Sequence, residues 1–193
     1  MSISLQFKLS DFEDASARID SSIRQTPLLK ADRLFHNPLS TGNLFLKLEN
    51  LQPTGSFKVR GAMNTLSMLS KQEKQKGLIT ASGGNHGLAV AYAAFMAQVP
   101  SLIFLPSTTP TKKIEKLRSW GAAIQVIGDV WDEANEAALE KAEENKMTYV
   151  HPFADKRVIE GQGTVALEIF KSAPEIDTLV VAVGGGGLIS VSY

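Results

Sequence analysis

The sequence of 193 residues contains no cysteine, and this absence removes several kinds of chemistry. Disulfides, iron–sulfur clusters, thiolate zinc sites and a cysteine nucleophile all need a thiol, so none of them can belong to this chain. Histidine is also scarce, with three residues, and we therefore expect no metal site. A chain without disulfides is compatible with the reducing cytoplasm, which is the location we expect.

Net charge and long apolar runs are lacking as well. Twenty Lys and Arg residues balance twenty Asp and Glu residues, so the formal charge is zero. A neutral chain has no electrostatic basis for binding nucleic acid or an anionic membrane, and we expect neither partner. No window approaches the roughly 18 consecutive apolar residues of a membrane span. Residues 1–9 do not have the pattern of a signal peptide, so we expect neither a leader nor an anchor.

Short apolar runs alternate with longer amphipathic segments along most of the chain. The runs predict strands over residues 43–48, 78–80, 101–105, 124–127, 148–150 and 178–183. The amphipathic segments predict helices over residues 12–23, 57–69, 87–98, 111–120, 131–145 and 158–172. Because such alternation is typical of a parallel sheet covered by helices on both faces, the predicted fold class is α/β.

In open α/β sheets ligands bind beyond the carboxyl ends of the strands, so a site is expected in the loops at that edge. One loop passes through residues 53–55 (Pro-Thr-Gly) into a helix predicted to begin at about Ser56, with Lys58 in its first turn. A buried lysine at the positive end of a helix should have a lowered pKa. A lysine that forms a Schiff base needs a neutral amine. Taken alone, however, this loop is explained at least as well by a solvated lysine.

A second loop follows the strand predicted at residues 78–80. Its adjacent glycines, Gly83 and Gly84, would let a ligand approach the backbone, while Ser82 and Asn85 offer hydrogen-bonding groups at the mouth of a helix. The pattern predicts a cradle for a polar ligand. A helix cap in which Asn85 bonds to the local backbone explains it equally well. The residues alone assign no role to His86.

A third loop, the four glycines of residues 184–187, follows the run at residues 178–183. Consecutive glycine amides can form a nest that binds phosphate without a basic side chain. The run lacks the Lys and Ser/Thr of a nucleotide P-loop, and its spacing does not match the dinucleotide-binding fingerprint. Together, the three loops describe a site for a phosphorylated carbonyl cofactor, and pyridoxal 5′-phosphate meets that description.

Ordered motifs of the chain resemble the fold-type II pyridoxal-phosphate enzymes, especially the serine/threonine dehydratase and serine racemase branch. The motifs are Thr26-Pro27-Leu28, KLENLQPTGSFKVRGA at 47–62, SGGNHG at 82–87, His151-Pro152-Phe153, GQGT at 161–164 and GGGG at 184–187. The resemblance implies the tryptophan-synthase-beta-like fold, a three-layer sandwich around a parallel sheet. It implies that residues 1–50 begin a larger domain, that 51–148 form a smaller α/β domain, and that 149–193 return into the larger domain, whose C-terminal part is missing.

The resemblance also assigns a role to each of the three loops. Lys58 would hold the cofactor covalently and would remove or return the α-proton of the substrate. Phe57 and Asn85 would flank the cofactor, with the Asn85 amide at its 3′-oxygen. The cofactor phosphate would be bound by the amides of Gly184, Gly185, Gly186 and Gly187. The substrate carboxylate would face the loop of Ser82, Gly83, Gly84, Asn85 and His86.

The implied activity is that of an ammonia-lyase, which converts L-serine or L-threonine to a keto acid and ammonia. Racemases of the family carry a serine at the position of Gly83, so Gly83 favours a dehydratase, although Ser82 leaves a serine racemase-like isomerase open. A catalytically inactive binding protein also stays open, and a nicotinamide dinucleotide binder is disfavoured. The expected partner is an amino-acid substrate, and a homodimer is compatible with the sequence.

Overall fold

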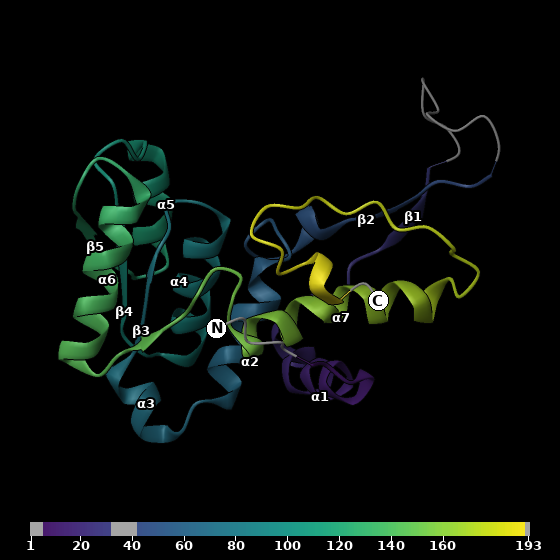
Figure 1. Ribbon diagram of the computed structural model, residues 1–193, viewed down its shortest axis with the longest axis horizontal. Coiled ribbons are helices and arrows are strands. Elements are labelled where there is room, and N and C mark those ends of the chain that lie inside the picture. Colours follow the sequence, from purple (N-terminus) through teal and green to yellow (C-terminus); the bar gives the residue numbers. More distant parts are fainter. Residues whose placement is uncertain (1–5, 32–41, 192–193) are drawn as a thin grey trace.

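The computed structural model describes residues 6–31 and 42–191, which form two lobes joined by helix α2 (Figure 1). One lobe contains a four-stranded parallel sheet with the strand order β5-β4-β3-β6. Its strands are β3 (Leu78–Ala81), β4 (Ser101–Leu105), β5 (Ala123–Val126) and β6 (Thr148–Tyr149). The parallel sheet confirms the predicted α/β class.

Helices cover both faces of this sheet, because alternate residues of each strand point to opposite sides. They are α4 (Asn85–Ala97), α5 (Thr111–Ser119) and α6 (Trp131–Asn145). Leu78 and Ile103 pack into a core with α4 and α5, whereas Ile79 and Phe104 pack against α6. The buried face of α6 consists of small residues, Ala134, Ala138 and Ala142. The result is a three-layer sandwich.

The other lobe is built mainly from helices (Figure 1). It contains α1 (Leu9–Ile19), α7 (Lys156–Ser172) and an antiparallel ribbon of β1 (Leu28–Lys30) and β2 (Phe45–Lys47). Helix α2 (Lys58–Met68) packs against α7 on one side and against α4 on the other. Helix α2 therefore contacts both lobes. The domain boundaries predicted at residues 50/51 and 148/149 stay predictions.

Helices α2 and α7 cross at very short range where Gly61 meets Gly161. A Cβ atom on Gly161 would lie 2.6 Å from the Arg60 carbonyl oxygen and 2.6 Å from the Gly61 Cα. Any side chain there would push the two helices apart. The paired glycines therefore set how closely the lobe of α7 approaches the helix that carries Lys58.

All six predicted helices are present, with ends that differ by a few residues. The structure adds one helix, α3 (Lys71–Lys76), and the 3-10 turns η1 (Asp20–Ser22), η2 (Glu49–Leu51) and η3 (Ile189–Val191). Helix α3 has no apolar stripe and begins with a capping box in which the Ser70 hydroxyl accepts a hydrogen bond from the Glu73 amide at 3.2 Å. No helix of the described residues combines the length and apolar character of a membrane span.

Five of the six predicted strands are present, although the first belongs to the antiparallel ribbon and not to the parallel sheet. The strand predicted over residues 178–183 is wrong: this segment forms no strand, and Val180 and Val183 are 96% and 66% exposed. A strand needs a neighbouring strand to pair its backbone groups. The parallel sheet lies in the other lobe (Figure 1), and this segment pairs with no strand among the described residues.

Candidate functional site

Lys58 is the first residue of α2 and so lies in the first turn, where the sequence predicts it, although the helix begins two residues later than the predicted Ser56. The chain reaches it through a tight turn in which Gly55 has a φ of +78° and its amide donates to the Gln52 carbonyl at 2.8 Å. The Lys58 Nζ atom donates a hydrogen bond to the Pro152 carbonyl at 2.8 Å and lies 5.2 Å from the centroid of the Phe57 ring. Lys58 forms no ion pair with any described carboxylate, and burial lowers its pKa.

The loop between β3 and α4 leaves one polar side chain uncommitted. The Ser82 hydroxyl accepts a hydrogen bond from the Gly84 amide at 3.2 Å. The Asn85 side chain is exposed and makes no hydrogen bond to another described residue, so the interpretation of Asn85 as a helix cap is wrong. Gly83 faces Thr109, whose Cγ2 atom would lie 2.8 Å from a Cβ on residue 83.

His86 lies in the core and not on the surface of this loop. Its side chain is buried, and its Nε2 atom lies 2.9 Å from the Val150 carbonyl oxygen. Because a carbonyl only accepts, Nε2 carries the proton and Nδ1 is a buried acceptor without a partner among the described residues. Burial lowers the pKa of His86 to about 4. The imidazole is therefore neutral near pH 7.

The four glycines of residues 184–187 form a turn that packs on Phe153. A Cβ atom on Gly185 would lie 2.2 Å from the Phe153 ring, and one on Gly187 would lie 3.1 Å from the Phe153 carbonyl oxygen. Gly186 has a φ of +84°, which favours glycine. None of the four glycine amides donates a hydrogen bond to another described backbone group. The turn thus offers free N–H donors, and at Gly185 and Gly187 it leaves no room for a side chain.

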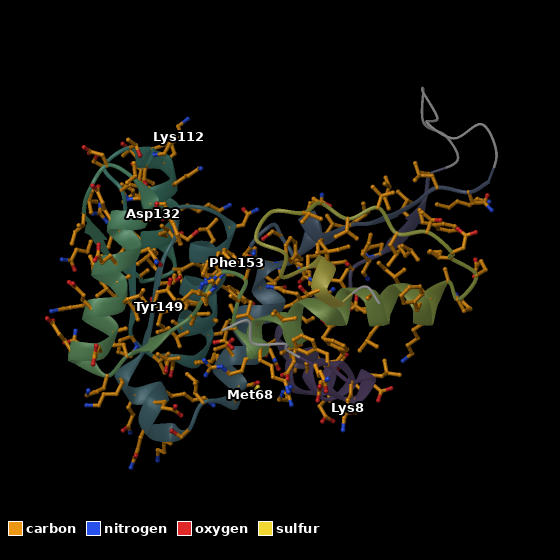
Figure 2. All side chains as sticks on the ribbon, viewed as in Figure 1. Lys8, Met68, Lys112, Asp132, Tyr149 and Phe153 are labelled. Carbon is orange, nitrogen blue, oxygen red and sulfur yellow. The ribbon has the colours of Figure 1, made fainter. Side chains whose placement is uncertain are left out.

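Residues 151–153 bring the lysine and the glycine turn to one place. Pro152 supplies the acceptor for Lys58, and the neighbouring Phe153 contacts the glycines, where the two lobes meet (Figure 2). The sequence marked His151-Pro152-Phe153 only as part of a resemblance and gave these residues no role. No three His, Asp or Glu side chains gather as metal ligands within residues 6–31 and 42–191.

These features fit a phosphorylated carbonyl cofactor. The amine of Lys58 is partly desolvated and has no counter-charge, which suits a nucleophile for an aldehyde. The glycine turn has amides without partners among the described backbone groups, which suits an anion. Asn85, the first residue of α4, has a side-chain amide without a partner among the described residues. The residues present are thus those that such a group requires.

The model of one protein family, described as "Pyridoxal-phosphate dependent enzyme", matches residues 19–192. The chain belongs to this family. It is 43% identical over 182 residues to an L-threonine ammonia-lyase of Thermotoga maritima, which covers 94% of this chain and 45% of that protein. The chain spans about half the length of the curated relatives that it matches.

Solved structures of the family have the same arrangement of elements. A maize serine racemase matches with a TM-score of 0.90 at 34% identity, covering 96% of this chain and 56% of that one. The processed form of threonine deaminase isoform 2 from Solanum lycopersicum matches with a TM-score of 0.83 at 37% identity, covering 96% of this chain and 52% of that one. This agreement confirms the predicted fold-type II architecture.

Arg60, two residues after Lys58, is the centre of a buried ionic network that the sequence did not reveal. The Arg60 side chain has no exposed surface and donates to both oxygens of Glu49, each at 2.8 Å. It also donates to both oxygens of Glu168, at 2.7 and 3.0 Å, and Lys47 pairs with Glu168 as well. Burial alone would lower the Arg60 pKa, but the two carboxylates outweigh it and raise that pKa.

This network connects three separate parts of the chain. Glu49 lies in η2, Arg60 in α2 and Glu168 in α7. Two positive and two negative side chains balance each other, so the network is electrically neutral. It therefore anchors the first turns of α2, and with them Lys58, to the helical lobe.

Proposed function

We propose that this chain belongs to a pyridoxal-phosphate-dependent lyase that dehydrates and deaminates L-threonine and L-serine. The net reaction converts L-threonine to 2-oxobutanoate and ammonia. The observation that carries the proposal is Lys58, a partly buried amine with a lowered pKa, which donates to Pro152, the residue before the phenylalanine on which the turn of four glycines packs. The 43% identity to an L-threonine ammonia-lyase supports the choice of substrate.

When bound, pyridoxal phosphate supplies an electron-withdrawing ring that stabilises negative charge on the α-carbon of an amino acid. Lys58 provides the group that takes up the α-proton, and its lowered pKa makes a neutral amine more available near pH 7. The Pro152 carbonyl holds the Nζ atom in position through its hydrogen bond. Phe57 lies beside the same amine.

The other site residues bind and orient. The amides of Gly184, Gly185, Gly186 and Gly187 would bind the phosphate, because they are free donors. Asn85 would donate its unpaired amide to the cofactor oxygen next to the aldehyde. The substrate carboxylate would be bound by the loop of Ser82, Gly83, Gly84, Asn85 and His86, where His86 contributes its backbone, since its ring points into the core.

A serine racemase is the second candidate, because a maize serine racemase is among the similar structures. Racemisation needs a proton donor on the face of the α-carbon opposite the lysine. Gly83 has no hydroxyl to offer there, and Thr109 crowds the space that a side chain at residue 83 would need. The Ser82 hydroxyl accepts a hydrogen bond from the Gly84 amide and keeps its own proton, so Ser82 leaves the racemase open as an alternative. The lack of a hydroxyl at Gly83 favours the lyase.

The proposal is tested by incubating the protein with pyridoxal phosphate and either L-threonine or L-serine. The lyase predicts keto acid and ammonia in equal amounts, and Lys58→Ala should abolish both. Lys112→Ala is the matched control, because Lys112 is exposed on the sheet-containing lobe, away from Phe153 (Figure 2). D-serine without keto acid would favour the racemase. Full activity in Lys58→Ala would contradict both, and no uptake of cofactor would favour the inactive binding protein.

Location, assembly and domain division are parts of the same proposal. The balanced charge and the lack of cysteine support a cytoplasmic location. Light scattering tests the homodimer, and limited proteolysis tests the domain boundaries near residues 50 and 148. A monomer, or cleavage elsewhere, would remove the corresponding part of the proposal and leave the chemistry of Lys58 standing.

A further inference from the structure

His151 occupies an unusual position in the segment that joins β6 to α7. Its Nδ1 atom lies 3.1 Å from the amide nitrogen of Phe153 and 2.8 Å from that of Ala154. Both amides donate, so Nδ1 must present a lone pair. The imidazole is therefore neutral and carries its proton on Nε2.

The two hydrogen bonds shape the backbone turn on which the candidate site depends. This turn directs the Pro152 carbonyl at the Lys58 Nζ atom, 2.8 Å away. It also places Phe153 against the glycine turn, where a Cβ on Gly185 would lie 2.2 Å from the ring. The His151 ring packs edge-on against the Phe153 ring, with centroids 4.7 Å apart and an interplanar angle of 90°.

We propose that His151 is a positioning residue, whose unprotonated Nδ1 atom builds the turn that gives Lys58 its acceptor and the glycine turn its support. The sequence assigns no role to His151, and His151 is not one of the residues proposed to bind the cofactor. The part of the inference that concerns the cofactor rests on the proposed function. The part that concerns the turn and the Lys58 amine does not.

Protonation of His151 should break this arrangement. A proton on Nδ1 would point at two N–H donors, and both hydrogen bonds would be lost. The ring is surrounded by Lys58 of α2, His86 of α4, Tyr149 of β6 and Asp155 of its own segment. Burial lowers the pKa of His151, with Asp155 opposing and Lys58 adding to this effect. Tyr149 and His86 are neutral near pH 7, since their pKa values are about 12 and about 4.

The sign of the pH effect follows from the lowered pKa. The folded protein binds fewer protons at His151 than the unfolded chain does. The turn is therefore fully stable above the ordinary histidine pKa of 6.5 and is lost as the pH falls through the pKa of the folded state. This predicts that the site opens on the acid side of pH 6.5.

Two substitutions separate the role of the Nδ1 acceptor from the effect of protonating His151. His151→Asn places an amide oxygen close to the position of Nδ1 and cannot be protonated in this range. His151→Leu has a similar volume and no acceptor. If His151 only filled space, the two variants would differ little, or the leucine would be better tolerated. If the acceptor matters, the asparagine preserves the turn and the leucine does not.

The first measurement uses cofactor-free protein and NMR hydrogen exchange of the Phe153 and Ala154 amides. In the wild type we expect protection at pH 7.5 that weakens at acid pH. His151→Asn should keep protection at both pH values. His151→Leu should exchange about five- to tenfold faster at pH 7.5, the effect expected from one lost hydrogen bond. Equal exchange in all three proteins would overturn the inference, and the wild-type titration decides the matter even if His151→Leu does not fold.

The second measurement follows the Lys58 amine in the same cofactor-free proteins. Competitive acylation with acetic anhydride, quantified by mass spectrometry, compares Lys58 with the exposed Lys112 in one sample. The Lys58/Lys112 ratio should change at least about threefold in His151→Leu and stay at the wild-type value in His151→Asn. An unchanged ratio in His151→Leu would show that His151 does not act on Lys58.

The third measurement brings in pyridoxal phosphate. Its dissociation constant should rise about tenfold in His151→Leu and should lose its dependence on acid pH in His151→Asn. If the first two measurements succeed and the wild type does not bind pyridoxal phosphate, the proposed function is wrong and the role of His151 in the turn stands. If the wild type binds it and both variants bind it like the wild type, the inference is wrong and the proposed function stands.

Discussion

Arg60→Met should be among the most destabilising changes in this chain, because it breaks a buried ionic network. Methionine approximates the length of the arginine stem, so the loss falls mainly on the guanidinium and its hydrogen bonds. After the change, Glu168 keeps its contact with Lys47, while Glu49 keeps Thr26 and Gln52 as its hydrogen-bond donors among the described residues. A buried carboxylate without its cation is strongly destabilising.

The magnitude follows from the burial of the pair. Removing one partner of a buried ion pair costs about 3–5 kcal/mol. In a chain of this size about 1 kcal/mol shifts the melting temperature by roughly 2–4 °C, so Arg60→Met should melt about 6–20 °C below the wild type. The control is Lys141→Met, because Lys141 pairs with Glu144 at the surface, where such a pair contributes about 0–1 kcal/mol.

Differential scanning calorimetry of cofactor-free protein measures these shifts. A double variant, Arg60→Met with Glu49→Gln, should melt above the value expected from adding the two single losses, because the glutamine removes the uncompensated charge. The reasoning would be refuted if Arg60→Met melted within about 2 °C of Lys141→Met, or if the two network changes were additive.

Other predictions address the turn, the loop and the core. Gly185→Ala should weaken pyridoxal phosphate binding at least about tenfold by isothermal titration calorimetry, since its Cβ would overlap an aromatic ring, whereas Gly184→Ala, which keeps its amide and meets no protein atom within 4 Å, should weaken it less. Equal binding would contradict this account of the turn. Gly83→Ala should lower lyase activity, and Thr109→Ser, which removes the crowding methyl group, should restore it; lack of rescue would exclude steric crowding as the cause. Because the pKa of His86 is lowered from 6.5 to about 4, the free energy of unfolding should fall as the pH drops between these values, and His86→Asn should reduce that slope in denaturant titrations. An unchanged slope would rule out His86 as a source of acid sensitivity.

The layered part of the fold could be predicted because its signals are local. Apolar runs and amphipathic segments alternate from residue 78 to residue 149, and each run became a strand of the parallel sheet. Helix α3 was missed because its six residues carry no apolar period, and its signals lie at its two ends, in the cap of Ser70 with Glu73 and in Gly77 after the last turn. The run at residues 178–183 was wrongly predicted to be a strand. Its apolar character indicates burial, but a strand also needs a neighbouring strand to pair with, and the run itself does not show whether one is present.

The candidate site also has one part that the sequence predicts and another that it does not. Lys58 could be placed at the start of a helix because the turn before it is encoded by adjacent residues. Its acceptor, Pro152, lies 94 residues away, and Arg60 meets Glu168 across 108 residues. No local pattern encodes such pairs, and a fully buried arginine runs against the usual exposure of charged residues. These contacts became visible only in the folded chain.

The most direct test of the account asks which amine holds the cofactor. The protein is saturated with pyridoxal phosphate, reduced with borohydride, digested and mapped by tandem mass spectrometry. We predict one pyridoxyl-modified residue, Lys58, and the loss of that modification in Lys58→Ala. Modification of a different lysine in the wild type, or of none in protein that has taken up the cofactor, would contradict the account.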